Sequence, residues 1–166
     1  MSNENKPLIA VVMGSVSDKD AVAPVFKTLE DFGISYTKHV YSAHRAPDLV
    51  AEFAKAAESK GYKAIIGCAG MAAALPGAIK AYTTVPVVGL PISGANDPAP
   101  MAPLLAMTQM PPGEPVLTVA INGAANAALG AIEIVATSDE SVRQQLRAYK
   151  QKMLDGIIKA NGELNK

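Results

Sequence analysis

The sequence of 166 residues lacks tryptophan and has a single cysteine, Cys68. One cysteine excludes a disulfide framework and a cysteine-rich zinc site. Cys68 lies in the apolar run AIIGCAG without a neighbouring base, so we interpret it as a core residue rather than a nucleophile. Histidine is almost as scarce, since His39 and His44 are the only two. They lie on opposite sides of a predicted strand end and cannot converge on one ion, so we predict no metal site.

The sequence also lacks an excess of charge of either sign, because Lys plus Arg and Asp plus Glu each number 15. We therefore predict neither nucleic acid nor a membrane surface as a partner. No apolar run reaches the ~18 residues that suggest a membrane span. The first residues, MSNENKPLIA, lack the basic and apolar regions of a secretory signal, so we expect a cytoplasmic protein.

What the sequence does contain is an alternation of short apolar runs with segments of helical periodicity. Continuous apolar runs are typical of strands covered on both faces, and the less apolar run at 35–40 is expected to be an edge strand. The predicted strands are Leu8–Met13, Ser35–Val40, Ala64–Ala69, Val85–Leu90 and Val116–Ile121. The predicted helices are Asp18–Phe32, Pro47–Lys60, Ala72–Tyr82, Met101–Thr108, Gly123–Ala136 and Asp139–Ala160. Pro24 predicts that the first helix starts late or bends.

This alternation predicts an α/β fold with three α/β/α layers and a mostly parallel sheet, flavodoxin-like or Rossmann-like. We expect one domain over residues 1–166, with a flexible tail at 1–6 and a long C-terminal helix at 139–160 that closes the fold. The residues predicted to form the apolar stripe of that helix are Val142, Leu146, Tyr149, Met153, Ile157 and Ala160. Ligands of such folds bind at the carboxyl ends of strands. The proline-rich connection Ile92–Pro115 is long enough to suggest a function.

Three loops at predicted strand ends are candidates for a site. In MGSVSD, at 13–18, backbone N–H groups and the Ser15 and Ser17 hydroxyls could cradle a phosphate, with Ser17 or Asp18 capping the helix. A plain capped turn is the alternative, and the dinucleotide and P-loop motifs are absent. In SAHR, at 42–45, His44 can transfer protons and Arg45 can grip an anion; a surface turn is the alternative.

The third loop, GCAGMAAALPG at 67–77, is made mostly of small residues that let a backbone approach a flat ligand closely. Tight packing of a helix on the sheet is the alternative, and composition alone favours it. His39 lies inside a predicted strand, and we interpret it as structural or interfacial rather than catalytic.

Together these loops resemble the PurE family of purine biosynthesis. The family patterns Met-Gly-Ser-x-Ser-Asp, Ser-Ala-His-Arg and Ala-Gly followed by Leu-Pro-Gly match MGSVSD, SAHRAP and AGMAAALPG, and QMPPGEPV at 109–116 matches a fourth. The similar segments run in order over about residues 8–137. Mutase-type members convert N5-carboxyaminoimidazole ribonucleotide to 4-carboxyaminoimidazole ribonucleotide. Arg45 and Met71-Ala72-Ala73 are similar to this type rather than to the animal-type carboxylases, which carry Ser-Ala-His-Lys and Ala-Gly-Arg-Ser-Asn.

The resemblance implies a homo-octamer without cofactor or metal that acts on an aminoimidazole ribonucleotide. It implies proton transfer by His44, phosphate binding by Arg45 with Ser42 nearby, and binding of ribose hydroxyls by Asp18. The other residues implied in substrate binding are Ser15, Ser17, Ala43, Ala69, Gly70, Met71, Ala72 and Leu75.

The chain departs from the family pattern at Ala74, where mutase-type members have histidine, and at ISGANDPAP, residues 92–100. Ala74 leaves open a carboxylase that uses free carbon dioxide. The sequence is also compatible with a PurE-like enzyme for a different nucleotide and with a non-catalytic nucleotide-binding module. An FMN carrier is disfavoured because the chain has only five Tyr and three Phe for stacking.

Overall fold

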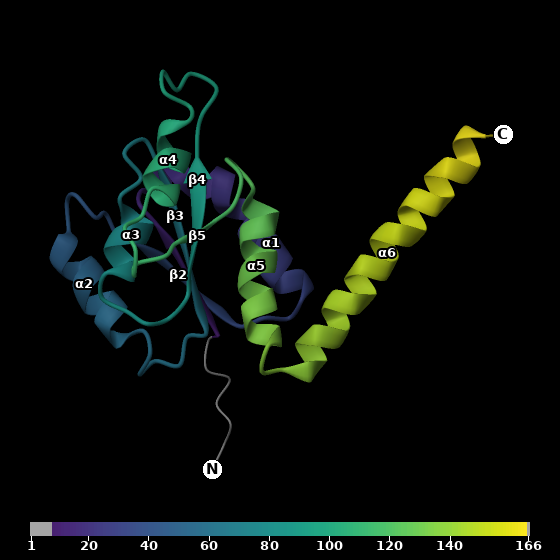
Figure 1. The fold of residues 1–166 in the computed structure, drawn as a ribbon, viewed down its shortest axis with the longest axis horizontal. Helices are drawn as coiled ribbons and strands as arrows, with labels where there is room; N and C mark the ends of the chain where they lie inside the picture. The colour runs from purple at the N-terminus through teal and green to yellow at the C-terminus, as the bar shows by residue number, and fades with distance from the viewer. Residues whose placement is uncertain (1–7, 166) are drawn as a thin grey trace, which may run out of the picture.

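A computed structural model of the protein describes residues 8–165. Five parallel strands form one sheet in the order β2-β1-β3-β4-β5 (Figure 1). They are β1 (Ile9–Met13), β2 (Tyr36–Val40), β3 (Ala64–Gly70), β4 (Val87–Ile92) and β5 (Leu117–Thr118). The predicted edge strand is confirmed as β2. The tail predicted at 1–6 lies outside the described residues.

Helices cover both faces of this sheet, so the predicted three-layer α/β/α fold is confirmed. The helices are α1 (Lys19–Asp31), α2 (Pro47–Ala56), α3 (Leu75–Lys80), α4 (Ala102–Thr108), α5 (Ala124–Ala136) and α6 (Glu140–Leu164). Figure 1 shows α1 and α5 on one face and α2, α3 and α4 on the other. Residues alternate along β1: Val11 packs in the core with α1 and α5, and Val12 packs in the core with α2 and α3. All of β1 is buried because both of its faces are covered.

Of the two alternatives that Pro24 left open, a late start and a bend, the late start is wrong. A 3-10 turn, η1 (Val16–Asp18), leads directly into α1, which continues through Pro24. Pro24 lies on the exposed side, while Val22, Val25 and Leu29 are buried against the sheet. Burial of this apolar face offsets the backbone hydrogen bond that proline cannot donate.

Three other elements are clearly shorter than predicted, and the first is α2, which ends at Ala56 instead of Lys60. Helix α3 begins only at Leu75, because Met71 and Ala73 have φ angles of 54° and 42°, outside the right-handed helical region. Strand β5 has two residues instead of six, because only Leu117 and Thr118 pair with β4. The predicted strand at 85–90 is shifted to 87–92.

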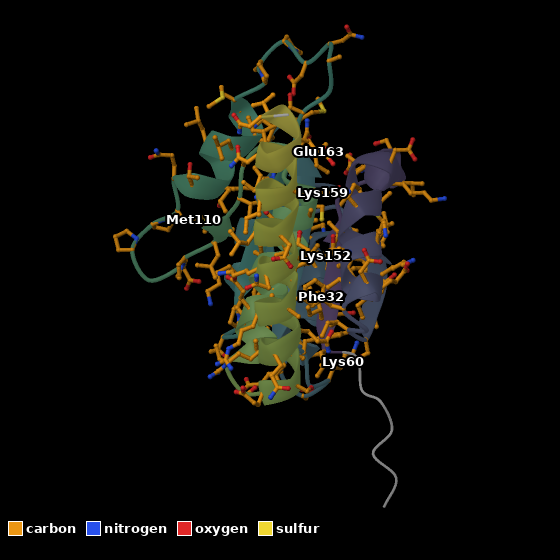
Figure 2. The ribbon with its side chains drawn as sticks, turned by 90° about the vertical axis from the view of Figure 1, so that its right-hand side faces the viewer. Phe32, Lys60, Met110, Lys152, Lys159 and Glu163 are labelled. Atoms are coloured by element: carbon orange, nitrogen blue, oxygen red, sulfur yellow. The ribbon has the colours of Figure 1, made fainter. Side chains whose placement is uncertain are left out.

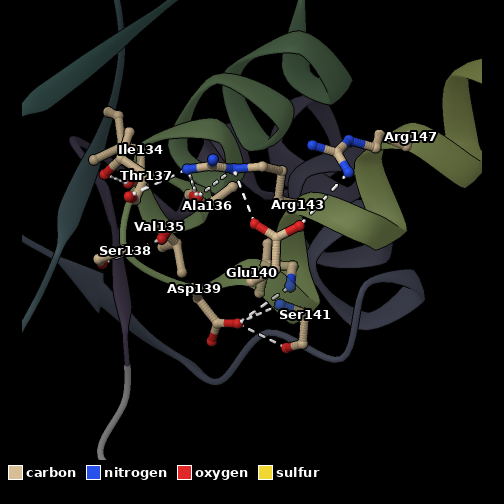
Figure 3. Close-up of polar contacts among 11 residues, drawn as sticks. Ile134, Val135, Ala136, Thr137, Ser138, Asp139, Glu140, Ser141, Arg143 and Arg147 are labelled. Atoms are coloured by element: carbon tan, nitrogen blue, oxygen red, sulfur yellow. Dashed lines mark hydrogen bonds and ion pairs between the residues drawn. The ribbon is translucent and has the colours of Figure 1, made fainter.

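The turn between α5 and α6 is held by side chains of its own residues (Figure 3). The Asp139 carboxylate accepts hydrogen bonds from the backbone N–H groups of Ser141, at 2.9 Å, and Val142, at 3.2 Å. The Arg143 guanidinium donates to the carbonyl oxygen of Ala136 at 2.8 Å. These bonds satisfy the free N–H groups that begin α6 and a carbonyl that ends α5, so the direction of α6 is defined locally.

The predicted long C-terminal helix is confirmed, but it covers the core only at its beginning. Val142 is buried, and Tyr149 packs against Phe32 with ring centroids 5.5 Å apart. Beyond that point α6 extends away from the body (Figure 1), and Lys152, Lys159 and Glu163 lie along it (Figure 2). The predicted stripe packs against the body at Val142 and Tyr149, whereas Met153 and Ile157 are 49% and 64% exposed in a single chain.

Candidate functional site

The three loops that carry the sequence motifs meet at one edge of the sheet. This follows from the topology, because β1 lies between β2 and β3 and all three strands run parallel. The Tyr41 N–H donates to the Met13 carbonyl at 2.9 Å, and the Gly14 N–H donates to the Cys68 carbonyl at 3.0 Å. These bonds extend the sheet past the ends of its strands and fix the first loop between the other two.

The first loop presents two serine hydroxyls beside the start of a helix. The Ser15 hydroxyl oxygen accepts hydrogen bonds from the Ser17 N–H at 3.3 Å and from the Ser17 hydroxyl at 2.8 Å. Asp18 occupies the predicted N-cap position of α1, but its side chain makes no capping bond, and the Ser15 side chain caps η1 instead. Burial raises the pKa of Asp18, while hydrogen bonds with Ser15 and Ser17 oppose this shift.

The second loop fixes an arginine beside the first. The Ser42 hydroxyl oxygen accepts from the Arg45 backbone N–H at 3.3 Å and from its Nε at 3.2 Å. The Arg45 Nη2 lies 3.5 Å from the Gly14 carbonyl oxygen, at the outer limit of a hydrogen bond. Arg45 and His44 are both exposed, whereas Ala43 packs on the core. The turn therefore presents a fixed cation and an accessible imidazole at the sheet edge.

His39 has a different environment from His44. Its ring stacks on Tyr41 at 5.4 Å and tilts against Phe53 at 5.0 Å, and its Nε2 lies 2.8 Å from the Thr37 hydroxyl. Burial lowers the pKa of His39, and the Lys60 cation lowers it further. A partly buried, stacked imidazole of this kind fits the structural interpretation.

The third loop is shaped by close backbone contacts. A Cβ added at Gly70 would lie 2.8 Å from the Ile92 carbonyl oxygen, so only glycine lets β3 and β4 meet there. Met71 and Ala72 then turn outward, and Met71 is 81% exposed. Ala69 and Leu75, both predicted to bind substrate, are buried in the core. They support the loop from beneath.

A cavity of about 660 Å³ lies against this loop. Asp18 and the three residues Gly70, Met71 and Ala72 form part of its wall, and the segment between Ile92 and Ala102 forms the rest. The sequence indicated this segment by its length and by its departure from the family pattern. Its polar members, Asn96 and Asp97, belong to no motif that would have marked them. The remaining predicted residues are not in the lining: Ser15, Ser17, Ser42, Ala43, His44, Arg45, Ala69 and Leu75.

A hollow of similar size, about 690 Å³, lies between β5 and α5. It is lined mainly by apolar residues such as Val116 and Ile134, and none of the predicted site residues borders it. Cavity size therefore does not distinguish the two cavities. The candidate site is instead indicated by the ionisable and hydroxyl groups that gather at the carboxyl ends of β1 and β2.

Other features limit the chemistry within residues 8–165. Cys68 is fully buried, and burial raises the pKa of its thiol, so a thiolate nucleophile is unavailable there. In this described part no group of three or more His, Cys, Asp or Glu residues is arranged to hold a metal ion. The same residues include no helix with the length and apolarity needed to cross a membrane.

Comparison with known proteins gives the family. A family model described as AIR carboxylase matches residues 8–155. The chain belongs to this family. The match spans all three loops and the cavity beside the third, and it confirms the resemblance drawn from the motifs.

Relatives within the AIR carboxylase family cover nearly the whole chain. The chain is 43% identical over 147 residues to N5-carboxyaminoimidazole ribonucleotide mutase of Pyrococcus abyssi, covering 89% of this chain and 84% of the relative. It is 42% identical over 161 residues to the Escherichia coli K12 protein of the same name, covering 95% of each. A crystal structure of Treponema denticola PurE has a TM-score of 0.85 and 27% identity, covering 96% of this chain and 99% of that one.

Proposed function

We propose that this chain is a mutase that converts N5-carboxyaminoimidazole ribonucleotide to 4-carboxyaminoimidazole ribonucleotide in purine biosynthesis. The observation that carries this proposal is identity of 42% to the named Escherichia coli mutase over 95% of both chains. The convergence of the three motif loops at one sheet edge supports it independently. The carboxylate moves from the exocyclic nitrogen of the substrate to a ring carbon.

The phosphate end of the substrate is assigned to the first two loops. Arg45 supplies the cation, and its bond to Ser42 holds the guanidinium beside the first loop. The Ser15 and Ser17 hydroxyls at the start of η1 supply further hydrogen-bonding groups for a phosphate. Asp18 repels a phosphate, and we assign it to the ribose hydroxyls.

The imidazole ring and its carboxylate are assigned to the cavity beside Gly70, Met71 and Ala72. The N-carboxylate is a carbamate, which breaks its C–N bond to release carbon dioxide while the exocyclic nitrogen takes a proton. A cavity that excludes water keeps the released carbon dioxide beside the ring carbon, so recombination is effectively unimolecular. The ring carbon then forms the new C–C bond.

His44 is assigned to proton transfer in this sequence of steps. After the C–C bond has formed, the ring carbon carries both a proton and the new carboxylate. An imidazole can take this proton and restore the aromatic ring. The proton removed from carbon balances the one gained by nitrogen.

Carboxylation of aminoimidazole ribonucleotide by free carbon dioxide is the second candidate, and Ala74 favours it. This residue lies at the start of α3, is exposed and makes no capping bond, so it supplies no group to a carboxylate. The distinguishing observation is the yield of product from aminoimidazole ribonucleotide plus bicarbonate, compared with the yield from the N-carboxylated substrate. If the chain is a mutase, the Ala74→His variant should still prefer the N-carboxylated substrate.

We propose further that the chain is a cytoplasmic homo-oligomer, with an octamer as the expected size. The apolar side chains of Met153, Leu154, Ile157 and Ile158 are about half exposed or more along α6 in a single chain, which supports their burial by another copy. Sedimentation velocity with the full chain tests this, and a monomer at micromolar concentration would contradict it.

The first experiment is a direct assay with freshly prepared N5-carboxyaminoimidazole ribonucleotide, following formation of the carbon-carboxylated isomer without ATP or added metal. Conversion well above the uncatalysed rate is the expected result. A folded protein that binds the nucleotide without converting it would overturn the proposal.

A further inference from the structure

Asn122 joins two segments of the chain that the sequence keeps 29 residues apart. Its side-chain amide donates from Nδ2 to the Ser93 carbonyl oxygen at 2.8 Å, and its Oδ1 accepts from the Ser93 N–H at 3.1 Å. Its own backbone N–H donates to the Pro91 carbonyl at 2.9 Å. The paired amide bonds require this orientation of the side chain, because a carbonyl cannot donate and an N–H cannot accept.

Asn122 suits this position through its backbone as well as its side chain. Its φ of 57° lies in the left-handed region, which asparagine tolerates better than most residues. The following Gly123 leaves no room for a Cβ, which would lie 2.8 Å from the Ala120 carbonyl oxygen. The turn leads directly into α5, whose inner face is buried, so the asparagine projects from a firmly packed base.

The segment held by Asn122 is the start of a cavity wall. Ser93 ends the extended chain after β4, and its hydroxyl donates to the Asp97 carboxylate at 3.1 Å. The second oxygen of Asp97 accepts from the Ala99 N–H at 2.9 Å, and the Asp97 N–H donates to the Gly94 carbonyl at 3.1 Å. The loop 93–99 is therefore tied to itself through Asp97 and to the rest of the protein through Ser93.

Loop 93–99 faces the third motif loop, at 67–77, across the cavity. Its residues Gly94, Asn96 and Asp97 share the cavity wall with Gly70 and Met71. Asn122 is not itself part of the wall. It acts on the cavity only by fixing Ser93, which lies between the lining residues Ile92 and Gly94.

We propose that Asn122 is a positioning residue of the active site, which holds loop 93–99 at the distance from Gly70–Ala72 that the substrate ring requires. The inference rests on the proposed function, because it assigns the ring to this cavity. Loss of the paired amide bonds lets the wall move away from the ring, which weakens substrate binding more than it slows the proton transfer at His44.

Asn122→Gly tests this, since glycine accepts the left-handed backbone and removes only the side-chain amide. We expect KM to rise roughly tenfold, as for the loss of one or two hydrogen bonds, with kcat falling less than threefold. In the free protein, amide hydrogen exchange should accelerate in peptides covering 93–99 and stay unchanged in β1 and β3. The same substitution at Asn161, exposed near the end of α6, is the matched control and should alter neither quantity.

The outcomes separate the inference from the proposed function. If wild-type protein does not convert the N-carboxylated substrate, the proposed function fails, and exchange in loop 93–99 still decides whether Asn122 holds the loop. If the wild type is active, unchanged exchange or an unchanged KM in Asn122→Gly overturns the inference.

Should that variant not fold, Asn122→Asp replaces it, because the carboxylate keeps the acceptor for the Ser93 N–H and repels the Ser93 carbonyl oxygen. Faster exchange and a raised KM are again expected, and wild-type values overturn the inference.

Discussion

The two sides of the proposed site are built in different ways. The loops after β1 and β2 hold their functional groups with bonds between close neighbours, Ser15 to Ser17 and Ser42 to Arg45. The loop after β4 is held by a residue 29 positions away, Asn122. The first side carries the groups suited to proton transfer and anion binding, and the second gives the cavity its shape. Local motifs can therefore specify chemistry here, while shape depends on distant packing.

The strongest test of the chemical side is His44→Asn. We expect turnover to fall by roughly 10²- to 10⁴-fold, because asparagine cannot exchange protons at neutral pH. Nucleotide binding should persist, and the melting temperature should stay near that of the wild type since His44 is exposed. Steady-state kinetics and calorimetric binding check this. Normal turnover would remove His44 from the mechanism and leave the first side without a proton carrier.

The second test separates binding from proton transfer on the same side. Arg45→Ala should weaken substrate binding about ten- to a hundredfold, the equivalent of roughly 1.5–3 kcal/mol for a charged hydrogen bond. Because the contact is ionic, the difference between variant and wild type should shrink as salt increases. Arg147→Ala, an exposed substitution on α6, is the control and should bind like the wild type. Unchanged affinity of Arg45→Ala would contradict the phosphate assignment.

The third test is aimed at the contact between the two sides. Gly70→Ala places a Cβ about 2.8 Å from the Ile92 carbonyl oxygen, where β3 and β4 end together. We expect a stability loss of roughly 1–3 kcal/mol, as for other overpacking substitutions, measured by chemical denaturation. Gly94→Ala is the matched control, since no atom lies within 4 Å of its added Cβ. Equal stability of the two variants would show that the strand ends can separate freely.

The smallest expected effect concerns Asp18, which borders the cavity from the first side. Burial raises its pKa above the ordinary value of 3.8, so its ionised form is less favourable in the folded than in the unfolded protein. This destabilisation develops as the pH rises from the ordinary pKa through the raised one and is complete above both. Asp18→Asn should therefore raise the melting temperature slightly at pH 7, with the gain fading as the pH approaches 3.8.

Thermal melts of Asp18→Asn over a series of pH values check this expectation. Asp20→Asn, an exposed substitution in the first turn of α1, is the control and should bring no gain at pH 7. A lowered melting temperature of Asp18→Asn at pH 7 would contradict the burial argument. If Asp18→Asn binds the substrate more weakly and Asp20→Asn does not, the assignment of Asp18 to the ribose hydroxyls is supported.

The sequence by itself determined the alternation of strands and helices, the parallel sheet and the three motif loops. These features depend on short-range patterns: apolar runs such as that of β3, capping groups, and glycines at turns. Because parallel strands bring their carboxyl ends to one edge, MGSVSD and SAHR could be expected to meet from the chain order alone. The structure brings these loops together, and their role in binding and proton transfer stays a prediction.

Only the tertiary structure decided the later start of α3, the two-residue β5, the burial of Leu75 and the opposite wall of the cavity. The cavity wall in particular depends on contacts between residues distant in the sequence, such as the amide of Asn122 with Ser93 and the close approach of Gly70 to Ile92. The apolar stripe of α6 likewise indicated a buried face without indicating what would bury it. Periodicity reports that a side chain avoids water, whereas its partner is selected by packing across the whole fold.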